Sequence, residues 1–419
     1  MKKIEPAILK GTRDFLPPEM AKRNYVMARM RRIFERFGYA PIETPILTPA
    51  ETILSKYGEE GDRLTYHFKD AGDRDIALPY DLTVPFARYV AANYGDLPMP
   101  FKRYQIQRVW RAEKPQKGRL REFYQCDIDV VGTKSLLVEA EMARIMQEVF
   151  LALGLKEFKI KFNSRKLMNE ALESFGYEKD SVAIIRVIDK MDKIGEKGVI
   201  TELKEIGVRE AAKLVKYLSS SDAVEHGDLG DFVKHAKAMG VEEQYLQFDP
   251  TLARGLDYYT GIIFEVVSQD SELGTICAGG RYDNLTGMFE VNAPKSADPE
   301  LSGMGVAFGF ERIMLLLEEK GLLKNMRPAP EVLVTIFDET MVGDSLEIYK
   351  ALAAAGVNTE IYFEPVKLDK QLKYADKKGI AYVVVCGPKE RDNYELVLKD
   401  MQTGKQETLS LEDLVARLK

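Results

Sequence analysis

Two spacings of apolar residues alternate along the first part of the chain. From Pro17 to Gly38, apolar side chains recur every three or four residues, which predicts a helix that begins at the prolines and ends at the glycine. Residues 39–45 then predict a short strand. Residues 104–111 and 122–131 alternate apolar and polar positions, so they predict the two strands of a long hairpin whose tip is basic.

The pattern changes to short, charged helical stretches between about residues 166 and 236, which predicts a helical insertion. Strands return at 258–267, 275–278 and 303–308, and a helix follows over 310–320. After a proline-containing linker at 327–330, strand and helix patterns alternate to residue 418, which predicts a small α/β domain with partly parallel strands. We therefore expect a large domain over 1–325, interrupted by the insertion, and a small domain over 331–419.

The composition is typical of a globular protein with more than one domain. The chain has 419 residues, of which 45% are hydrophobic and 30% charged, and no apolar run could span a bilayer. The start lacks a secretory pattern and the three cysteines lie far apart, so we expect a cytoplasmic protein without disulfides or a membrane partner. The three histidines have no neighbours that would mark a catalytic triad or a zinc site, so no metal site is predicted.

The second strand of the hairpin carries the first candidate site. One of its faces consists of Phe123, Gln125, Asp127 and Asp129. This face is either open to solvent, as in many antiparallel sheets, or it is the wall of a cleft. The neighbouring strand would bring Arg111 and Glu113 alongside Phe123, which favours the cleft. A guanidinium for a phosphate, a phenyl ring for a base and a carboxylate for an exocyclic amine together suit ATP.

Four segments resemble signature motifs of histidyl-tRNA synthetases, a family of class II aminoacyl-tRNA synthetases. Residues 111–125 (RAEKPQKGRLREFYQ) resemble the second class motif, and residues 303–312 (GMGVAFGFER) resemble the third. Residues 252–261 (LARGLDYYTG) and 278–283 (AGGRYD) resemble motifs typical of synthetases for histidine and their close relatives. The resemblance implies an α+β catalytic domain on a mixed, mostly antiparallel sheet with a helical insertion, followed by a C-terminal α/β anticodon-binding domain.

The resemblance also implies roles for single residues. Arg111, Glu113, Phe123 and Arg312 would bind ATP, which would carry Mg²⁺ on its phosphates. Arg254 and Arg111 would be the fixed cations that stabilise charge during the reaction. Histidine would be bound by Asp81, Leu82, Thr83, Arg111, Gln125, Asp129, Arg254, Tyr258, Tyr259 and Tyr282. Asp129 and Tyr259 would pair with the imidazole nitrogens, and residues 81–83 with Gln125 would receive the α-amino group.

The implied activity is the joining of L-histidine to tRNA(His) by way of histidyl-adenylate. The basic hairpin tip would contact the tRNA through Gln116, Lys117, Arg119 and Arg121. Residues 11–14 and 39–45 resemble the first class motif, which implies a homodimer. Residues 367–377 (KLDKQLKYADK) resemble the anticodon-binding domain of this group of synthetases.

Two positions depart from the family pattern, and one relative offers another function. Lys114 stands where arginine is usual, which keeps the charge but loses the bidentate fork, and Pro79 stands where arginine is common. The main alternative is the synthetase-like regulatory subunit of ATP phosphoribosyltransferase, which senses histidine without catalysis. That relative typically lacks the end domain and the catalytic arginines, which this chain keeps. The synthetase-like region of a stress kinase fits less well, because no kinase signature is present.

Overall fold

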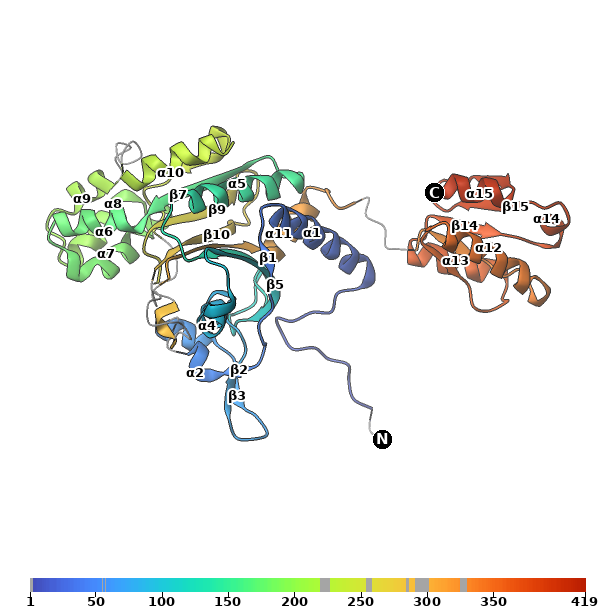
Figure 1. Ribbon diagram of the computed structural model, residues 1–419, viewed down its shortest axis with the longest axis horizontal. Coiled ribbons are helices and arrows are strands. Elements are labelled where there is room, and N and C mark those ends of the chain that lie inside the picture. Colours follow the sequence, from blue (N-terminus) through green and yellow to red (C-terminus); the bar gives the residue numbers. More distant parts are fainter. Residues whose placement is uncertain are drawn as a thin grey trace. The chain divides into compact units, whose positions relative to one another are not determined.

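The computed structural model describes residues 3–54, 56, 58–218, 227–253, 258–283, 286–290, 301–324 and 330–419 (Figure 1). They form two compact units. The larger unit contains residues 1–14 and 26–322, and the smaller unit contains residues 15–25 and 323–419.

An eight-stranded sheet is the centre of the larger unit. Its strands are β1 (Ala40–Pro41), β5 (Phe101–Trp110), β6 (Glu122–Val131), β7 (Phe158–Ser164), β8 (Leu246–Phe248), β9 (Ile262–Ser268), β10 (Thr275–Tyr282) and β11 (Gly303–Gly309). Their order is β1-β5-β6-β11-β10-β9-β7-β8. Only β1 with β5 and β7 with β8 pair in parallel. The expected mixed, mostly antiparallel sheet is confirmed.

The hairpin agrees closely with the sequence pattern, whereas the first strand is shorter than predicted. β6 has the predicted bounds, and β5 ends at Trp110, so that Arg111 lies just beyond the strand. Residues 39–45 were expected to form a strand, but only Ala40 and Pro41 do so. Proline has no N–H to donate to a neighbouring strand, so Pro41 and Pro45 limit the pairing of this segment.

Aromatic side chains join one face of the sheet to its helices. The ring of Phe308 on β11 lies 5.6 Å from that of Phe34 on α1 (Pro17–Arg36) and 5.8 Å from that of Phe150 on α5 (Leu137–Ala152). Phe232 on α10 (Gly227–Ala238) packs 5.1 Å from Phe162 of β7. Figure 1 shows α5 and α10 beside this sheet. Because side chains alternate along a strand, the polar residues of β6 point to the opposite face.

The helical insertion has a core of its own. It contains α6 (Arg165–Ser174), α7 (Ser181–Ile188), α8 (Met191–Glu205) and α9 (Ala211–Leu218). Leu172, Ile184, Leu203 and Leu214 are fully buried within it. The Ser164 hydroxyl accepts a hydrogen bond from the backbone N–H of Leu167 and so caps the first helix. The predicted helical character of this stretch is therefore confirmed.

The larger unit also contains a small three-stranded sheet. In the larger unit, β2 (Thr48–Pro49), β3 (His67–Lys69) and β4 (Asp75–Ala77) form a three-stranded sheet in the order β2-β4-β3. α2 (Ala50–Ile53) and α3 (Gly58–Leu64) lie between β2 and β3 in sequence, and α4 (Thr83–Asn93) follows β4. α11 (Phe310–Glu319) follows β11 directly.

The smaller unit is the α/β domain that the alternating pattern predicts. Its strands are β12 (Val332–Val334), β13 (Thr359–Ile361), β14 (Tyr382–Val385), β15 (Leu396–Asp400) and β16 (Gln406–Leu409), in the order β13-β12-β14-β15-β16. The first three are parallel. Its helices are α12 (Val342–Ala354), α13 (Leu368–Lys378), α14 (Pro388–Asp392) and α15 (Leu411–Leu418). The sequence pattern does not predict β16, because its side chains are mostly exposed and few are apolar.

A buried ion pair connects β10 to α5. Nη2 of Arg281 lies 2.7 Å from Oε2 of Glu139, and Nε of Arg281 donates to the other carboxylate oxygen. The same guanidinium donates to the hydroxyl of Ser302 and to the carbonyl oxygen of Thr133. Glu139 is fully buried, so its charge depends on this one arginine for neutralisation.

Replacing Arg281 with methionine is expected to lower the free energy of unfolding of the larger unit by about 3–5 kcal/mol, because Glu139 would keep a buried, unpaired charge. The shift of the denaturant midpoint, followed by near-UV circular dichroism, measures this effect. The double variant Arg281→Met/Glu139→Leu should recover most of the loss. An unchanged midpoint in the single variant would show that the pair contributes little.

Candidate active site

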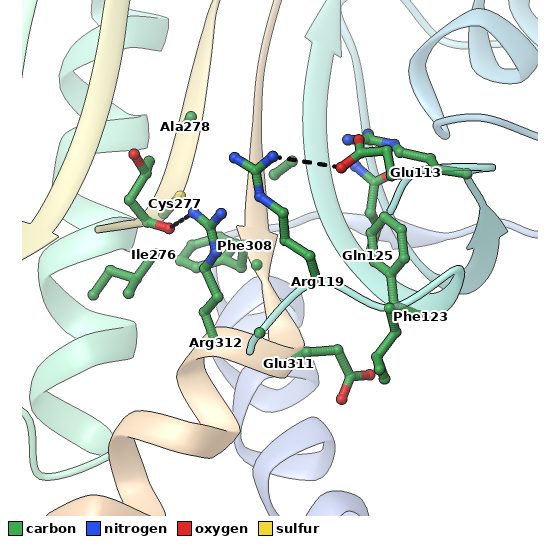
Figure 2. Close-up of a pocket in the computed structure, with 16 residues that line it drawn as sticks. Glu113, Arg119, Phe123, Gln125, Ile276, Cys277, Ala278, Phe308, Glu311 and Arg312 are labelled. Carbon is green, nitrogen blue, oxygen red and sulfur yellow. Dashed lines mark hydrogen bonds and ion pairs between the residues drawn. The ribbon is translucent and has the colours of Figure 1, made fainter. Parts of the chain in front are cut away.

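A cavity of about 300 Å³ lies between the β5–β6 hairpin and the β11–α11 segment. Figure 2 shows Glu113, Phe123 and Gln125 on one side of this cavity and Arg312 on the other, with Arg119 between them. Arg111 also lines it. The structure therefore brings together the residues for which the sequence predicted ATP binding.

Arg111 is held in place from two directions. Its Nε donates to the carbonyl oxygen of Tyr80 at 3.0 Å. The centre of its guanidinium group lies 4.4 Å from the centre of the Tyr80 ring and 5.3 Å from that of the Phe123 ring. An arginine fixed in this way loses little entropy when it binds an anion. Tyr80 directly follows Pro79, so this segment contacts Arg111 although it has proline where arginine is common.

Two more arginines face the same cavity. Nη1 of Arg312 donates to the carbonyl oxygen of Thr275 at 2.6 Å, and Nη1 of Arg119 lies 3.5 Å from Oε2 of Glu113. Burial, and then the charge of Arg119, lower the pKa of Arg312. Cations that disfavour each other in a partly buried cavity are suited to an anion such as a polyphosphate, which would offset their repulsion.

Hydrogen bonds within the loop and an ion pair to α11 hold the hairpin tip. The backbones of Gln116 and Arg119 exchange hydrogen bonds across a turn in which Gly118 has a φ of +73°. Lys117 pairs with Glu319 at 2.8 Å on the surface. Arg121 donates from Nε to the carbonyl oxygen of Glu113 at 3.1 Å, so it holds the loop together. Of the four residues predicted to contact tRNA, Arg119 lines the cavity itself.

A second, smaller cavity adjoins the first, because Ala307 lines both. Its other walls come from Thr83, Asp127, Asp129, Tyr259, Tyr282 and the backbone of β11. Its volume of about 20 Å³ has room for little more than one water molecule. A larger ligand therefore requires side chains to move.

Asp129 is the most firmly held side chain of the smaller cavity. Its Oδ2 lies 2.7 Å from Nη2 of Arg103, and its Oδ1 accepts a hydrogen bond of 2.8 Å from the hydroxyl of Tyr282. Burial, and then the charge of Asp129, raise the pKa of Tyr282, so this hydroxyl stays protonated and donates. One carboxylate oxygen thus pairs with a cation and the other with a neutral donor.

The sequence analysis missed Arg103, which is fully buried. Its guanidinium centre lies 4.5 Å from the centre of the Phe86 ring, and its Nη2 donates to the carbonyl oxygen of Leu82 at 3.3 Å. The register of the hairpin contains the signal that would have found it. If Val109 pairs with Phe123, counting six residues back along β5 and six forward along β6 places Arg103 opposite Asp129, as the structure has it.

The segment 81–83 begins α4 at the edge of the smaller cavity. Oδ1 of Asp81 accepts hydrogen bonds from the backbone N–H groups of Thr83 and Val84, at 3.1 and 3.2 Å. The Leu82 side chain is fully buried, so only its backbone is available to a ligand. The carboxylate therefore serves as the cap of this helix in the structure.

Of the other residues predicted to bind histidine, Tyr258 lies within the described residues and Arg254 does not. The ring of Tyr258 packs edge-on against Tyr259 and Tyr282, with centroids 5.1 and 6.1 Å apart. Arg254 was predicted to be catalytic, but it lies outside the described residues together with 255–257.

The described residues contain no group of three or more His, Cys, Asp or Glu side chains that could hold a metal ion. Within the same described ranges, no helix is both long and apolar enough to cross a membrane. Cys126, Cys277 and Cys386 are buried, and none of them forms a disulfide.

A mostly antiparallel sheet that carries an arginine-lined cavity between a long hairpin and a glycine-rich strand and helix defines a class II aminoacyl-tRNA synthetase. A family model described as histidyl-tRNA synthetase matches residues 11–313, and a model described as anticodon binding domain matches residues 331–419. The chain belongs to the histidyl-tRNA synthetase family.

Known proteins resemble the chain over nearly its whole length. It is 38% identical to the histidine–tRNA ligase of Cytophaga hutchinsonii, with 99% of each chain covered. The crystal structure of histidyl-tRNA synthetase from Nostoc is 31% identical, with a TM-score of 0.87 and 99% of both chains covered. A structure from Bacillus halodurans, described as an ATP phosphoribosyltransferase regulatory subunit/histidyl-tRNA synthetase, has a TM-score of 0.73 at 22% identity over 89% of this chain and 97% of that one. That last likeness shows the fold alone.

Glycine at position 305 is required by the neighbouring carboxylate. A Cβ atom there would lie 2.0 Å from Oδ1 of Asp129. Gly305→Ala is therefore expected to displace Asp129 and to lower histidine-dependent pyrophosphate exchange by roughly 10²-fold. Gly343→Ala is the matched control, because no atom lies within 4 Å of its Cβ on α12. Equal exchange rates for the two variants would show that Asp129 tolerates displacement.

Proposed function

We propose that the protein is a histidine–tRNA ligase, which activates L-histidine with ATP and transfers it to the 3′ end of tRNA(His). The observation that carries this proposal is the junction of the two cavities at Ala307. The lining of one cavity suits a nucleotide, and that of the other suits a small polar ring once its side chains move to make room, so the two substrates would meet beside Ala307. Family membership, at 38% identity to a histidine–tRNA ligase over the full length, supports the same activity.

Activation requires a carboxylate to approach the α-phosphorus of ATP, and pyrophosphate then leaves. No protein nucleophile is needed, because the histidine carboxylate is itself the attacking group. The barrier comes from bringing two anions together and from the charge that grows on the phosphoryl oxygens. Arg111, held by Tyr80, and Arg312, held by the carbonyl oxygen of Thr275, would stabilise that charge without reorganising. Arg254 would add a third cation at the carboxylate.

The nucleotide base would bind at the hairpin side of the larger cavity. Phe123 offers a flat apolar face, and Glu113 can accept a hydrogen bond from an exocyclic amine. Mg²⁺ would enter on the ATP phosphates and keep mostly water ligands, so it needs no cage of protein carboxylates. We place the protein in the cytoplasm, where reducing conditions suit three cysteines that form no disulfide.

The smaller cavity would select the imidazole ring of histidine. A neutral imidazole donates from one nitrogen and accepts at the other. Asp129 would accept from the ring N–H, and the hydroxyl of Tyr259 would donate to the second nitrogen. Burial raises the pKa of Tyr259, which keeps its hydroxyl protonated. Substrates without ring nitrogens would leave these buried groups unpaired, which can discriminate by around 10⁴-fold.

The smaller unit would bind the anticodon through exposed aromatic side chains. Phe363 follows β13 and is 86% exposed, and Phe337 follows β12 and is 45% exposed. The buried amide of Gln371 fixes the loops that carry them, because its Nε2 donates at 2.7 Å to the carbonyl oxygens of both Ile336 and Val366. Aromatic rings on fixed loops can stack with the unpaired bases of an RNA loop. At the other end of the tRNA, Gln116 and Lys117 would lie close to the acceptor stem.

Aminoacylation with a panel of amino acids tests the proposed activity. We expect charging of tRNA(His) with histidine alone. Arg111→Ala and Arg254→Ala should each lower pyrophosphate exchange by about 10²–10³-fold, because each removes a fixed cation from the transition state. Arg209→Ala, at an exposed position of the helical insertion, is the matched control and should leave the rate unchanged. Histidine binding without any charging of tRNA would instead favour the regulatory-subunit alternative.

We also propose that the protein works as a homodimer. Apolar side chains are exposed near the N-terminus and just after β1, at Ile4, Ile8, Leu9, Ile46 and Leu47. Exposed apolar side chains are frequent on surfaces that a partner covers, and both segments adjoin the stretches, 11–14 and 39–45, that resemble the first class motif. Sedimentation velocity at micromolar concentration should give the mass of two chains. An active species with the mass of one chain would contradict the dimer.

A further inference from the structure

A turn near the N-terminus packs against the hairpin loop beside the nucleotide cavity. The backbone N–H and the hydroxyl of Thr12 both donate to the carbonyl oxygen of Leu9, at 3.0 and 2.7 Å. Gly11, with a φ of +91°, occupies the third position of this turn, where a positive φ favours glycine. The resemblance of residues 11–14 to the first class motif implies a dimer contact, and the proposed mechanism does not use the turn.

Arg121 connects this turn to the hairpin. Its backbone N–H donates to the carbonyl oxygen of Gly11 at 2.8 Å, and its Nη1 donates to that of Lys10 at 3.2 Å. On the hairpin side, its Nε donates to the carbonyl oxygen of Glu113 at 3.1 Å. Its own carbonyl oxygen accepts from the backbone N–H of Arg111 at 2.9 Å. One residue thus binds both the turn and the two hairpin residues that are assigned to ATP.

The turn and the loop fit closely together. A Cβ atom on Gly11 would lie 2.7 Å from Cγ of Pro115 and 2.8 Å from Cγ of Arg121. The proline ring is rigid, and hydrogen bonds at both Nε and Nη1 hold the side chain of Arg121, so neither neighbour can easily move away. The position of the loop therefore depends on the position of the turn.

Glu113 is the residue of the loop whose position matters most to a nucleotide. Figure 2 shows its side chain at the cavity, on the side opposite Arg312. Its ion pair with Arg119 is 3.5 Å long and partly exposed, so this pair holds the carboxylate only weakly. The bond from Arg121 instead fixes the backbone from which the Glu113 side chain extends. A carboxylate that recognises a base requires such support, because a displacement of about 1 Å weakens the contact.

We propose that the turn at residues 9–12, acting through Arg121, positions Glu113 for the amino group of the nucleotide base. The inference rests on the proposed function, because it takes Glu113 as the acceptor for the exocyclic amine of ATP. Arg121 is then a positioning residue, which supports the preference for adenine without touching the nucleotide. This role does not involve tRNA, so it is separable from the RNA contact predicted for the same arginine.

Histidine-dependent pyrophosphate exchange without tRNA tests this role, with ATP and with purine riboside triphosphate, which lacks the amino group of adenine. Arg121→Lys keeps the positive charge, but its single nitrogen cannot replace the separate donors to Lys10 and Glu113. The KM for ATP should rise about 10-fold, while kcat and the KM values for the analogue and for histidine stay within about twofold. Gly11→Ala should have the same effect, because its Cβ would push the turn away from the loop.

Gly176→Ala is the matched control, because Gly176 has a similar φ of +78° but no atom within 4 Å of its Cβ, so every KM should stay unchanged. The two test variants alter the contact from opposite sides, so a folding defect in one leaves the other as the test. Equal rises of KM for ATP and the analogue would show that Arg121 only shapes the cavity. Normal exchange with impaired charging of tRNA would show that it serves the RNA alone. Either result overturns the positioning role, whereas an unmodified chain without exchange would overturn the proposed function itself.

Discussion

The ion pair between Arg103 and Asp129 joins two neighbouring strands at a point that is almost closed to water. A buried pair of this kind adds little net stability, because both charges must be desolvated. However, removing or displacing either partner would leave a buried charge without its counter-ion, so the surrounding residues must hold both side chains in place. The register of β5 on β6, the ring of Phe86 and the start of α4 all meet at this pair. The geometry of the smaller cavity depends on it.

The glycines of β10 and β11 follow from the same constraint. A Cβ atom on Gly305 would collide with Asp129, and one on Gly303 would lie 2.2 Å from Cε2 of Tyr282. The side chains of the smaller cavity therefore occupy space that these strands leave open. A glycine-rich strand is a weak motif when taken alone, but here each glycine has a neighbour that excludes a side chain. These glycines therefore make room for the side chains of the smaller cavity, and do not only allow a nucleotide to approach the backbone.

The two cavities have linings of opposite charge. Arginines held by backbone carbonyl groups and aromatic rings line the larger one, so positive charge is ready before ATP binds. Carboxylates and tyrosines line the smaller one, which therefore favours polar groups that can donate hydrogen bonds. Because one strand contributes to both, its side-chain spacing sets the distance between the nucleotide and the amino acid.

The sequence determined the elements and the face of β6 that carries the site. A two-residue period identifies Phe123, Gln125 and Asp129 as one face, and family motifs identify Arg111, Glu113 and Arg312 as their partners. The alternation after residue 331 was sufficient for the small α/β domain. Roles for Arg254 remain predictions, since that residue lies outside the described ranges.

Only the tertiary structure decided which polar residues are buried and what they contact. Periodicity shows which way a side chain points, but not whether distant segments cover it. Thr83, Tyr259 and Tyr282 close the small cavity on the polar face of β6, so Arg103 and Asp127, which could have been solvated, lie buried in the site. Arg121 was predicted to contact tRNA, and the fold shows in addition that it donates to a carbonyl oxygen of its own loop. Contacts between residues far apart in the chain depend on packing, which local spacing does not encode.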